Sequence, residues 1–368
     1  MDTAKSGESE FDFRVHRERA VGNYQKIRPL YEEFSEVTKN VLNEALKVGE
    51  TKVHSIEARA KSIDSFGRKA SFQSDLDPSK PKYPDPLVQI TDLAGVRTIT
   101  FFPKTLDDVD RAISSQFDVI EKTDKADVLF KEGKFGYQSI HYVVRFKPNR
   151  TGLPEYERFA GLVAEIQVRT LLQHAWAEIE HDIQYKSIET IPDLIRRRFT
   201  SLAGLLEIAD REFQAIQNED ERITQQARKS VVEGQLEGVE ITPDALKAYL
   251  DKTFSSDGRM SEFSYQFAAK TLRRMGFTNF KQIDECIKGY DGDQVNRILY
   301  GTRQGQITRF ESLVEAGMGN NYLRRHPWRM YEWFVERCGR HSVALKAAGI
   351  SQGSYSPPES RESMNEAT

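Results

Sequence analysis

The sequence predicts an α+β domain, in which helices flank a mixed β-sheet, followed by an all-α C-terminal domain. Short β-rich segments alternate with amphipathic helices through the first half of the chain, which is typical of an α+β fold. One pair of neighbouring strands suits a hairpin. Beyond residue 239 only helical periodicity remains, which favours a separate helical domain.

Composition fits this division. The 368 residues are 38% hydrophobic and 30% charged, with a mean hydropathy of −0.60, which is typical of roughly two globular domains. The net charge of −3 does not demand a nucleic acid or an anionic membrane as partner. No apolar run approaches the ~18 residues of a membrane helix, and the polar start is unlike a signal peptide. Two distant cysteines, Cys286 and Cys338, exclude a disulfide framework, so we expect a cytoplasmic protein.

The α+β domain is predicted at residues 23–228, after a flexible segment at 1–22. Its first element is a long amphipathic helix, because apolar residues such as Tyr24, Ile27 and Tyr31 recur at helical spacing. Alternating or β-rich runs predict strands at 53–60, 96–102, 117–120, 139–146 and 162–168. Further helices are predicted at 62–70, 105–116 (capped by Thr105), 170–184 and 192–226.

The C-terminal domain is predicted at residues 239–350. Thr242 followed by Pro243 is a helix N-cap with proline at the first position, and that helix extends to about residue 253. Later helices are predicted at 261–275, 279–288, 293–302, 309–316, 327–338 and 341–348. The tail, 351–368, has few apolar residues and is predicted to be disordered.

A basic motif lies where the first predicted strand gives way to a short helix. It contains Arg59, Lys61, Ser65, Arg68 and Lys69. Ser65 and Lys69 share one helix face, while Arg59 and Lys61 share one strand face. Donors that converge in this way suit a triphosphate, although a solvated surface is the usual fate of a run of basic residues.

Two carboxylates complete the candidate site. Asp92 closes a proline-rich loop just before a strand. Glu165, Gln167 and Arg169 alternate with apolar residues and therefore lie on one face of a strand. A polar strand face inside an apolar sheet indicates a cleft, and two carboxylates near a row of cations are what phosphoryl-type transfer with Mg²⁺ requires.

The order of these motifs resembles the synthetase domain of the RelA/SpoT family of alarmone synthetases, over residues 23–216. The motifs are R-x-K-x-x-x-S-x-x-R-K, D-L-A-G-V-R, G-Y-Q-S-I-H and E-I-Q-V-R-T. The resemblance implies a nucleotidyltransferase-like fold and Mg²⁺-dependent transfer of pyrophosphate from ATP to the 3′-OH of GDP or GTP. It also implies similarity to the small synthetases, in which an oligomer is possible.

The resemblance further implies a role for each matching residue. Asp92 and Glu165 would ligate Mg²⁺, or Glu165 would act as base on the acceptor hydroxyl. Residues for ATP would be Arg59 and Arg97 around the adenine, and Lys61, Ser65 and Lys69 on the triphosphate, with Arg68 a weaker candidate. Residues for the acceptor would be Tyr137, stacked on the base, and His141, Gln167 and Arg169. His174, Trp176, His181 and Tyr185 are expected to pack the following helix, with Trp176 as core.

One departure from the family pattern leaves the acceptor open. The family loop commonly places an asparagine and a lysine just before the tyrosine, whereas here Phe135 and Gly136 precede Tyr137. A related alternative is a toxin that pyrophosphorylates the 3′ end of tRNA and is restrained by an antitoxin or by its own C-terminal domain. A third is a catalytically dead nucleotide sensor that engages a partner protein.

Overall fold

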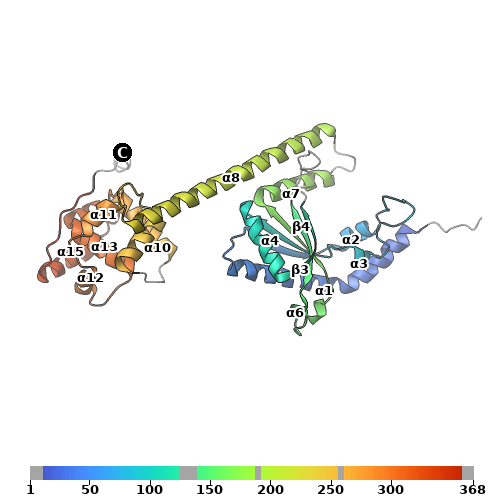
Figure 1. Ribbon diagram of the computed structural model, residues 1–368, viewed down its shortest axis with the longest axis horizontal. Coiled ribbons are helices and arrows are strands. Elements are labelled where there is room, and N and C mark those ends of the chain that lie inside the picture. The colour runs from blue at the N-terminus through green and yellow to red at the C-terminus, as the bar shows by residue number, and fades with distance from the viewer. Residues whose placement is uncertain (1–10, 125–138, 187–191, 256–260, 359–368) are drawn as a thin grey trace, which may run out of the picture. The chain divides into compact units, whose positions relative to one another are not determined.

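The computed structural model describes residues 11–124, 139–186, 192–255 and 261–358. The chain divides into two compact units, 1–216 and 217–368, each with its own hydrophobic core (Figure 1). The first unit is an α+β domain around a mixed sheet and the second is helical, as the sequence predicts. The division falls inside a helix, at 216/217, whereas the composition placed the end of the first domain at 228.

The described part of the first unit contains a five-stranded sheet with the order β1-β2-β5-β4-β3. Its strands are β1 (Ser55–Ala60), β2 (Ala94–Thr100), β3 (Phe117–Asp124), β4 (Ile140–Phe146) and β5 (Ala164–Thr170). β2 and β5 are parallel and the other neighbours are antiparallel, so the sheet is mixed. The central strand is therefore β5, which carries the E-I-Q-V-R-T motif, and its parallel neighbour β2 begins within the D-L-A-G-V-R motif.

Two helices cover the apolar face of this sheet. Phe34 and Leu42 from α1 and Ile113 from α4 are buried in one core with Val96 from β2 and Ile166 from β5. The helices of this part of the chain are α1 (Phe13–Val48), α2 (Ile63–Ala70), α3 (Pro86–Gln89), α4 (Lys104–Gln116), α6 (Pro148–Thr151), α7 (Leu171–Lys186) and α8 (Asp193–Glu233), and a 3₁₀ turn spans Glu157–Phe159. With one face filled in this way, the polar residues of β2 and β5 must face the other side.

Two helix starts differ from the prediction because their caps were not recognised. Asp12 accepts hydrogen bonds from the backbone N–H groups of Arg14 and Val15, so α1 begins at Phe13, inside the segment 1–22 that was predicted to be flexible. Residues 1–10 of that segment lie outside the described residues. Helix α4 begins at Lys104, after Pro103 in helical conformation, so Thr105 lies within the first turn and does not cap it.

The second unit contains a buried core shared by its helices. These are α9 (Pro243–Phe254), α10 (Glu262–Arg274), α11 (Phe280–Ile287), α12 (Gly292–Tyr300), α13 (Gln306–Met318), α14 (Asn320–Arg325) and α15 (Glu332–Ala347). The sequence did not predict α14. It predicted two helices, at 327–338 and 341–348, where the structure has the single helix α15. A Cβ at Gly339 would meet nothing within 4 Å, so this glycine marks neither a break nor a close approach.

The first part of the tail is ordered, which corrects the prediction of disorder over 351–368. The backbone N–H of Gly353 donates to the carbonyl of Ala316 over 2.9 Å, and that of Tyr355 donates to Gly317 over 3.0 Å. The ring of Tyr355 also stacks on Phe277, with 5.9 Å between centroids. A Cβ on Gly353 would lie 2.4 Å from the Gly317 carbonyl oxygen, so this close approach needs glycine. Residues 359–368 lie outside the described residues.

Candidate active site

A row of functional residues crosses the sheet at the register that pairs β2 with β5. Arg59 on β1 pairs with Gly95 on β2, and Gly95 pairs with Glu165 on β5. Two residues further along β2, Arg97 pairs with Gln167 on β5, and Gln167 pairs with His141 on β4. Because paired residues project to the same face, four strands place their polar side chains on one surface.

A cavity of about 180 Å³ lies over this surface. Its lining includes both candidate carboxylates, Asp92 and Glu165, and three of the candidate cations, Arg59, Lys61 and Arg97. The other lining residues are Glu57, Ala58, Gly95, Val96 and Gln167. Gly95 adds no side chain between Arg59 and Glu165, so the floor of the cavity stays open there. Asp92 and Glu165 therefore meet at one site although 73 positions (165 − 92) separate them.

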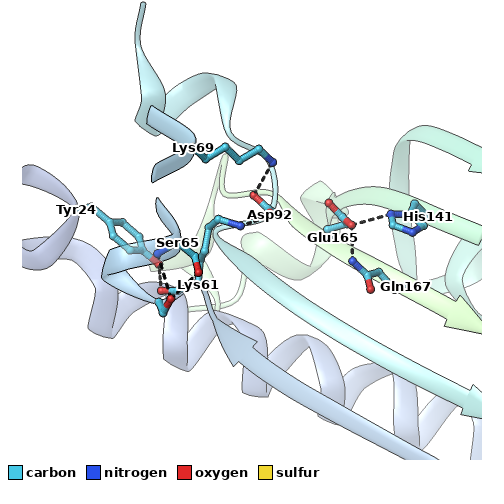
Figure 2. A network of polar contacts seen from close by, with 9 residues as sticks. Tyr24, Lys61, Ser65, Lys69, Asp92, His141, Glu165 and Gln167 are labelled. Atoms are coloured by element: carbon cyan, nitrogen blue, oxygen red, sulfur yellow. Dashed lines mark hydrogen bonds and ion pairs between the residues drawn. The ribbon is translucent and has the colours of Figure 1, made fainter. Parts of the chain in front are cut away.

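Asp92 holds two of the predicted phosphate-binding lysines. Lys61 Nζ lies 2.5 Å from one carboxylate oxygen of Asp92, and Lys69 Nζ lies 3.1 Å from the other (Figure 2). Lys61 follows β1, whereas Lys69 lies on α2, which Ser62 caps by accepting from the N–H of Ser65. The cap fixes where the helix begins, and therefore fixes the face on which Lys69 lies.

Two residues that fix Lys61 were not predicted from the sequence. The hydroxyl of Tyr24, on α1, donates to the Lys61 carbonyl over 2.8 Å (Figure 2). Arg28 Nε donates to the same oxygen over 3.4 Å. The fully buried Tyr24 ring also stacks on Phe66 of α2, with 4.4 Å between centroids. Burial raises the pKa of Tyr24 to about 12, so the hydroxyl keeps the proton that it donates. The only signal in the sequence was a tyrosine on the apolar face of a helix.

Glu165 lies between two donors. His141 Nδ1 is 2.8 Å from its Oε1, and the side-chain amide of Gln167 donates to the same oxygen over 2.8 Å (Figure 2). Burial opposes ionisation of Glu165, but the hydrogen bonds from His141 and Gln167, with the charges of His141 and Lys69, outweigh it and lower its pKa to about 2. The carboxyl group is therefore a stable anion at neutral pH.

The amide of Gln167 has a fixed orientation. Its nitrogen faces the Glu165 carboxylate, and its oxygen accepts from an Arg169 guanidinium nitrogen over 2.7 Å. Arg169 is only 4% exposed. Arg169 thus contacts Gln167 from a buried position, and its contact with an acceptor nucleotide, which the resemblance implied, stays a prediction.

Arg97 connects the sheet to α7. Its guanidinium lies 3.0 Å from Glu178 and 3.9 Å from Glu57. His174, one turn before Glu178, lies beside it, and burial followed by the charge of Arg97 lowers the pKa of His174. Trp176 on the same helix is buried, and its ring meets Phe199 of α8, so its expected packing role holds. His181 is exposed, and the side chain of Tyr185 lies outside the described residues.

Residues 58–190 match a family model described as a region found in RelA / SpoT proteins. This segment runs from β1 past α7 and contains both carboxylates and the cations of the cavity. The chain contains a RelA/SpoT domain.

Curated relatives align with the RelA/SpoT domain. The chain is 30% identical over 131 residues to the GTP pyrophosphokinase YwaC and 30% identical over 128 residues to the GTP pyrophosphokinase YjbM, both of Bacillus subtilis (strain 168). Each alignment covers 35% of this chain, and the chain spans 59% and 58% of the length of these two relatives.

Solved structures align over a longer stretch. Small alarmone synthetase 1 from Bacillus subtilis is 22% identical, with a TM-score of 0.44, over 55% of this chain and 99% of that one. The same protein bound to its product pppGpp gives 23% identity and a TM-score of 0.45, over 54% and 98% of the two chains.

The remaining predicted site residues of the RelA/SpoT domain differ in their placement. Ser65 does not line the cavity, and its hydroxyl accepts from Ser62 over 2.8 Å. Arg68 is exposed on α2. Tyr137, the predicted base-stacking residue, lies outside the described residues, as does the loop before it. No helix in the described part of the chain is long and apolar enough to cross a membrane.

Proposed function

We propose that this protein transfers the β,γ-pyrophosphate of ATP to the 3′-OH of GDP or GTP, giving (p)ppGpp and AMP. The observation that carries the proposal is the single cavity in which Asp92 and Glu165 lie with Arg59, Lys61 and Arg97. Relatives at 30% identity that are named GTP pyrophosphokinases support the same reaction and favour a free guanine nucleotide over tRNA as acceptor.

The charge of the cavity supports binding of a triphosphate. Lys61 and Lys69 both form ion pairs with Asp92, and the phosphate oxygens of ATP would give the two lysines further anionic partners there. Arg59 and Arg97 on neighbouring strands present planar guanidinium groups that can stack on a base or grip phosphate. Since phosphoryl-type transfer depends mainly on positioning and neutralisation of charge, such an arrangement supplies most of what the reaction needs.

Asp92 and Glu165 are the residues that would hold Mg²⁺. The described residues contain no group of three or more histidine, cysteine, aspartate or glutamate side chains suited to a metal. Mg²⁺ needs fewer protein ligands, because it commonly binds one or two carboxylates and completes its coordination shell with water and substrate phosphates. When bound, it would neutralise charge on the phosphates.

The low pKa of Glu165 bears on its role. In the proposed step the acceptor 3′-oxygen forms a bond to the β-phosphorus of ATP, the bond from that phosphorus to the bridging oxygen of AMP breaks, and the hydroxyl proton is released. A carboxylate with a pKa of about 2 accepts a proton poorly at neutral pH. This low pKa favours metal binding and electrostatic stabilisation over the role of base for Glu165.

The acceptor is tested by incubating the protein with γ-³²P-ATP and Mg²⁺ in parallel with GDP, GTP and deacylated tRNA. We expect label in a guanosine tetra- or pentaphosphate and stoichiometric AMP. Label in tRNA alone would contradict this proposal and support the alternative of a toxin that pyrophosphorylates tRNA. Absence of AMP with every acceptor would identify a catalytically dead protein.

The participation of Glu165 in the reaction is tested with Glu165→Gln, which keeps the size of the side chain and removes the charge. We expect a fall of at least about 100-fold in kcat, which is the scale for removing one electrostatic contact to a transition state. The matched control is Glu44→Gln, an exposed carboxylate on α1 that accepts hydrogen bonds from Asn43 and Lys47 of the same helix. It should leave kcat unchanged, and equal losses in both variants would show that Glu165 has no specific part in the reaction.

A further inference from the structure

The second unit carries aromatic side chains on its surface as well as in its core. Four apolar residues at the start of α10 and around the turn before α15 are 51% to 83% exposed, namely Phe263, Met330, Tyr331 and Trp333. Trp328 links them, because its ring lies 5.2 Å from that of Phe267 on α10 and 5.4 Å from that of Trp333 on α15. An exposed apolar surface of this kind marks an interaction site.

Exposed cations extend this surface along α10. One face of the helix carries, at successive spacings of four, three and four positions, Phe263, Phe267, Lys270 and Arg274. At 100° per residue these positions fall within an arc of about 60°. The two cations therefore continue the line that the two rings begin.

Two further arginines border the same surface. Arg325 donates to the carbonyl of Met275, just beyond α10, over 3.2 Å, so α14 ends beside the end of α10. Arg324 is exposed at this place, and Arg329, also exposed, follows Trp328 in the turn. We call these rings and cations the aromatic–basic surface.

The four cations of the aromatic–basic surface form no ion pair with a described residue, because the nearby ion pairs use other cations. Arg273 pairs with Glu240, and Arg340 pairs with Glu336. Glu332, in the first turn of α15, is an exposed carboxylate close by in the sequence. The surface is therefore positively charged, although the whole chain carries a net charge of −3.

We propose that the aromatic–basic surface binds single-stranded nucleic acid. A strand presents bases and phosphates side by side along its length, and the surface presents rings and cations in the same way. The rings of Tyr331 and Trp333 stack on each other with 6.4 Å between centroids, and both remain half exposed, so each keeps a face for a base. Such stacking tolerates any base, while arginine and lysine neutralise phosphates, so binding weakens with salt.

Two other anionic partners fit this surface less well. In a duplex the bases stack on each other, so the exposed rings would have no base to contact. An anionic membrane would take up the rings at one depth and bind the cations at another, nearer the headgroups. Helix α10 instead carries its rings and cations along one line.

The test measures the fluorescence anisotropy of a fluorescein-labelled single-stranded RNA of about 12 nucleotides as the full chain is added, without ATP or Mg²⁺. We expect saturable binding that weakens at least about tenfold between about 50 and 200 mM salt. Trp333→Ala should raise the dissociation constant about tenfold, the scale for losing one stacked base, and should leave binding of the matching duplex unchanged. Trp333→Phe keeps a ring and should retain most of the affinity.

The phosphate contacts are tested with Arg329→Gln. We expect a higher dissociation constant and a salt slope, on logarithmic axes, that is smaller by about 0.7, the contribution of one phosphate contact in a single strand. Lys281→Gln is the control, because it removes an equal charge from α11, where Lys281 pairs with Glu237. It should change neither quantity.

Absence of binding up to about 100 μM protein, or binding that Trp333→Ala and Arg329→Gln both leave unchanged, would overturn the proposal. Binding of phosphatidylglycerol vesicles without binding of RNA would overturn it as well and assign the surface to a membrane. Arg329 is exposed, so its variant tests the proposal even if Trp333→Ala unfolds the second unit. The measurement concerns binding alone and is independent of pyrophosphate transfer.

Discussion

Lys61 Nζ lies 2.5 Å from Asp92 Oδ2, although 31 positions separate the two residues in the chain. Lys69 reaches the other oxygen of the same carboxylate. The carboxylate therefore keeps two cations together that would otherwise repel each other, at the place where we propose that the phosphates of ATP bind.

Replacing Asp92 with asparagine should show how much depends on this contact. We expect kcat to fall by at least about 100-fold, because one proposed metal ligand and the counter-charge of both lysines are lost together. The free energy of unfolding should fall by no more than about 1 kcal/mol, since the ion pairs are partly exposed. Steady-state kinetics and urea unfolding measure the two effects. Asp118→Asn, which removes a carboxylate paired with Arg145, is the control and should keep full activity.

Tyr24→Phe should weaken ATP binding without removing the chemistry. The variant keeps the ring stacked on Phe66 but loses the hydroxyl that donates to the Lys61 carbonyl. We expect KM for ATP to rise several-fold with a smaller change in kcat, and stability to fall by about 1 kcal/mol, which is the usual contribution of one hydrogen bond. Tyr31→Phe, on the same helix, is the control. If both variants raise KM equally, Tyr24 does not position Lys61.

Gln167→Glu should change the pH dependence of the reaction. The new carboxylate would replace the amide that donates to Glu165. Like charges raise the pKa of the pair, although Arg169 offsets part of this effect. We expect the acidic limb of the kcat profile to move up by about one pH unit or more, so that activity is lost at a pH where the wild type keeps it. Gln116→Glu adds the same charge elsewhere in the unit, and an equal shift in that variant would contradict the explanation.

His326 should make the second unit sensitive to acid. Burial, followed by the charge of Arg337, lowers its pKa from 6.5 to about 4, and its Nδ1 accepts from the Trp328 backbone N–H over 3.1 Å. Because the unfolded chain binds the proton more readily, stability is complete above pH 6.5 and falls as the pH drops toward 4.

We expect a loss of about 2 kcal/mol between pH 7 and pH 5, measured by urea unfolding with the fluorescence of Trp328 and Trp333. His326→Asn keeps an acceptor and removes the titration, so its stability should change much less over that range. An unchanged slope in this variant would assign the pH dependence to other groups.

The fold class and the two carboxylates were predictable from local patterns. Alternation along 162–168 identified β5 and placed Glu165 and Gln167 on its polar face, because side chains alternate along any strand. The order of the motifs around them indicated the RelA/SpoT domain. The helix ends were less predictable. The cap at Asp12 precedes no regular apolar pattern. Gly339 suggested a break in a helix that the structure shows to be continuous.

The sequence by itself determined which residue types are available for the chemistry and on which face of each element they lie, since periodicity is a property of neighbouring residues. Only the tertiary structure decided which of them meet. The parallel register of β2 and β5 brings Gly95 beside Glu165, and the first helix fixes Lys61 through Tyr24. The buried Arg169 donates to the side chain of Gln167. These relationships depend on contacts between distant segments, and those contacts form only when the hydrophobic core brings the segments together.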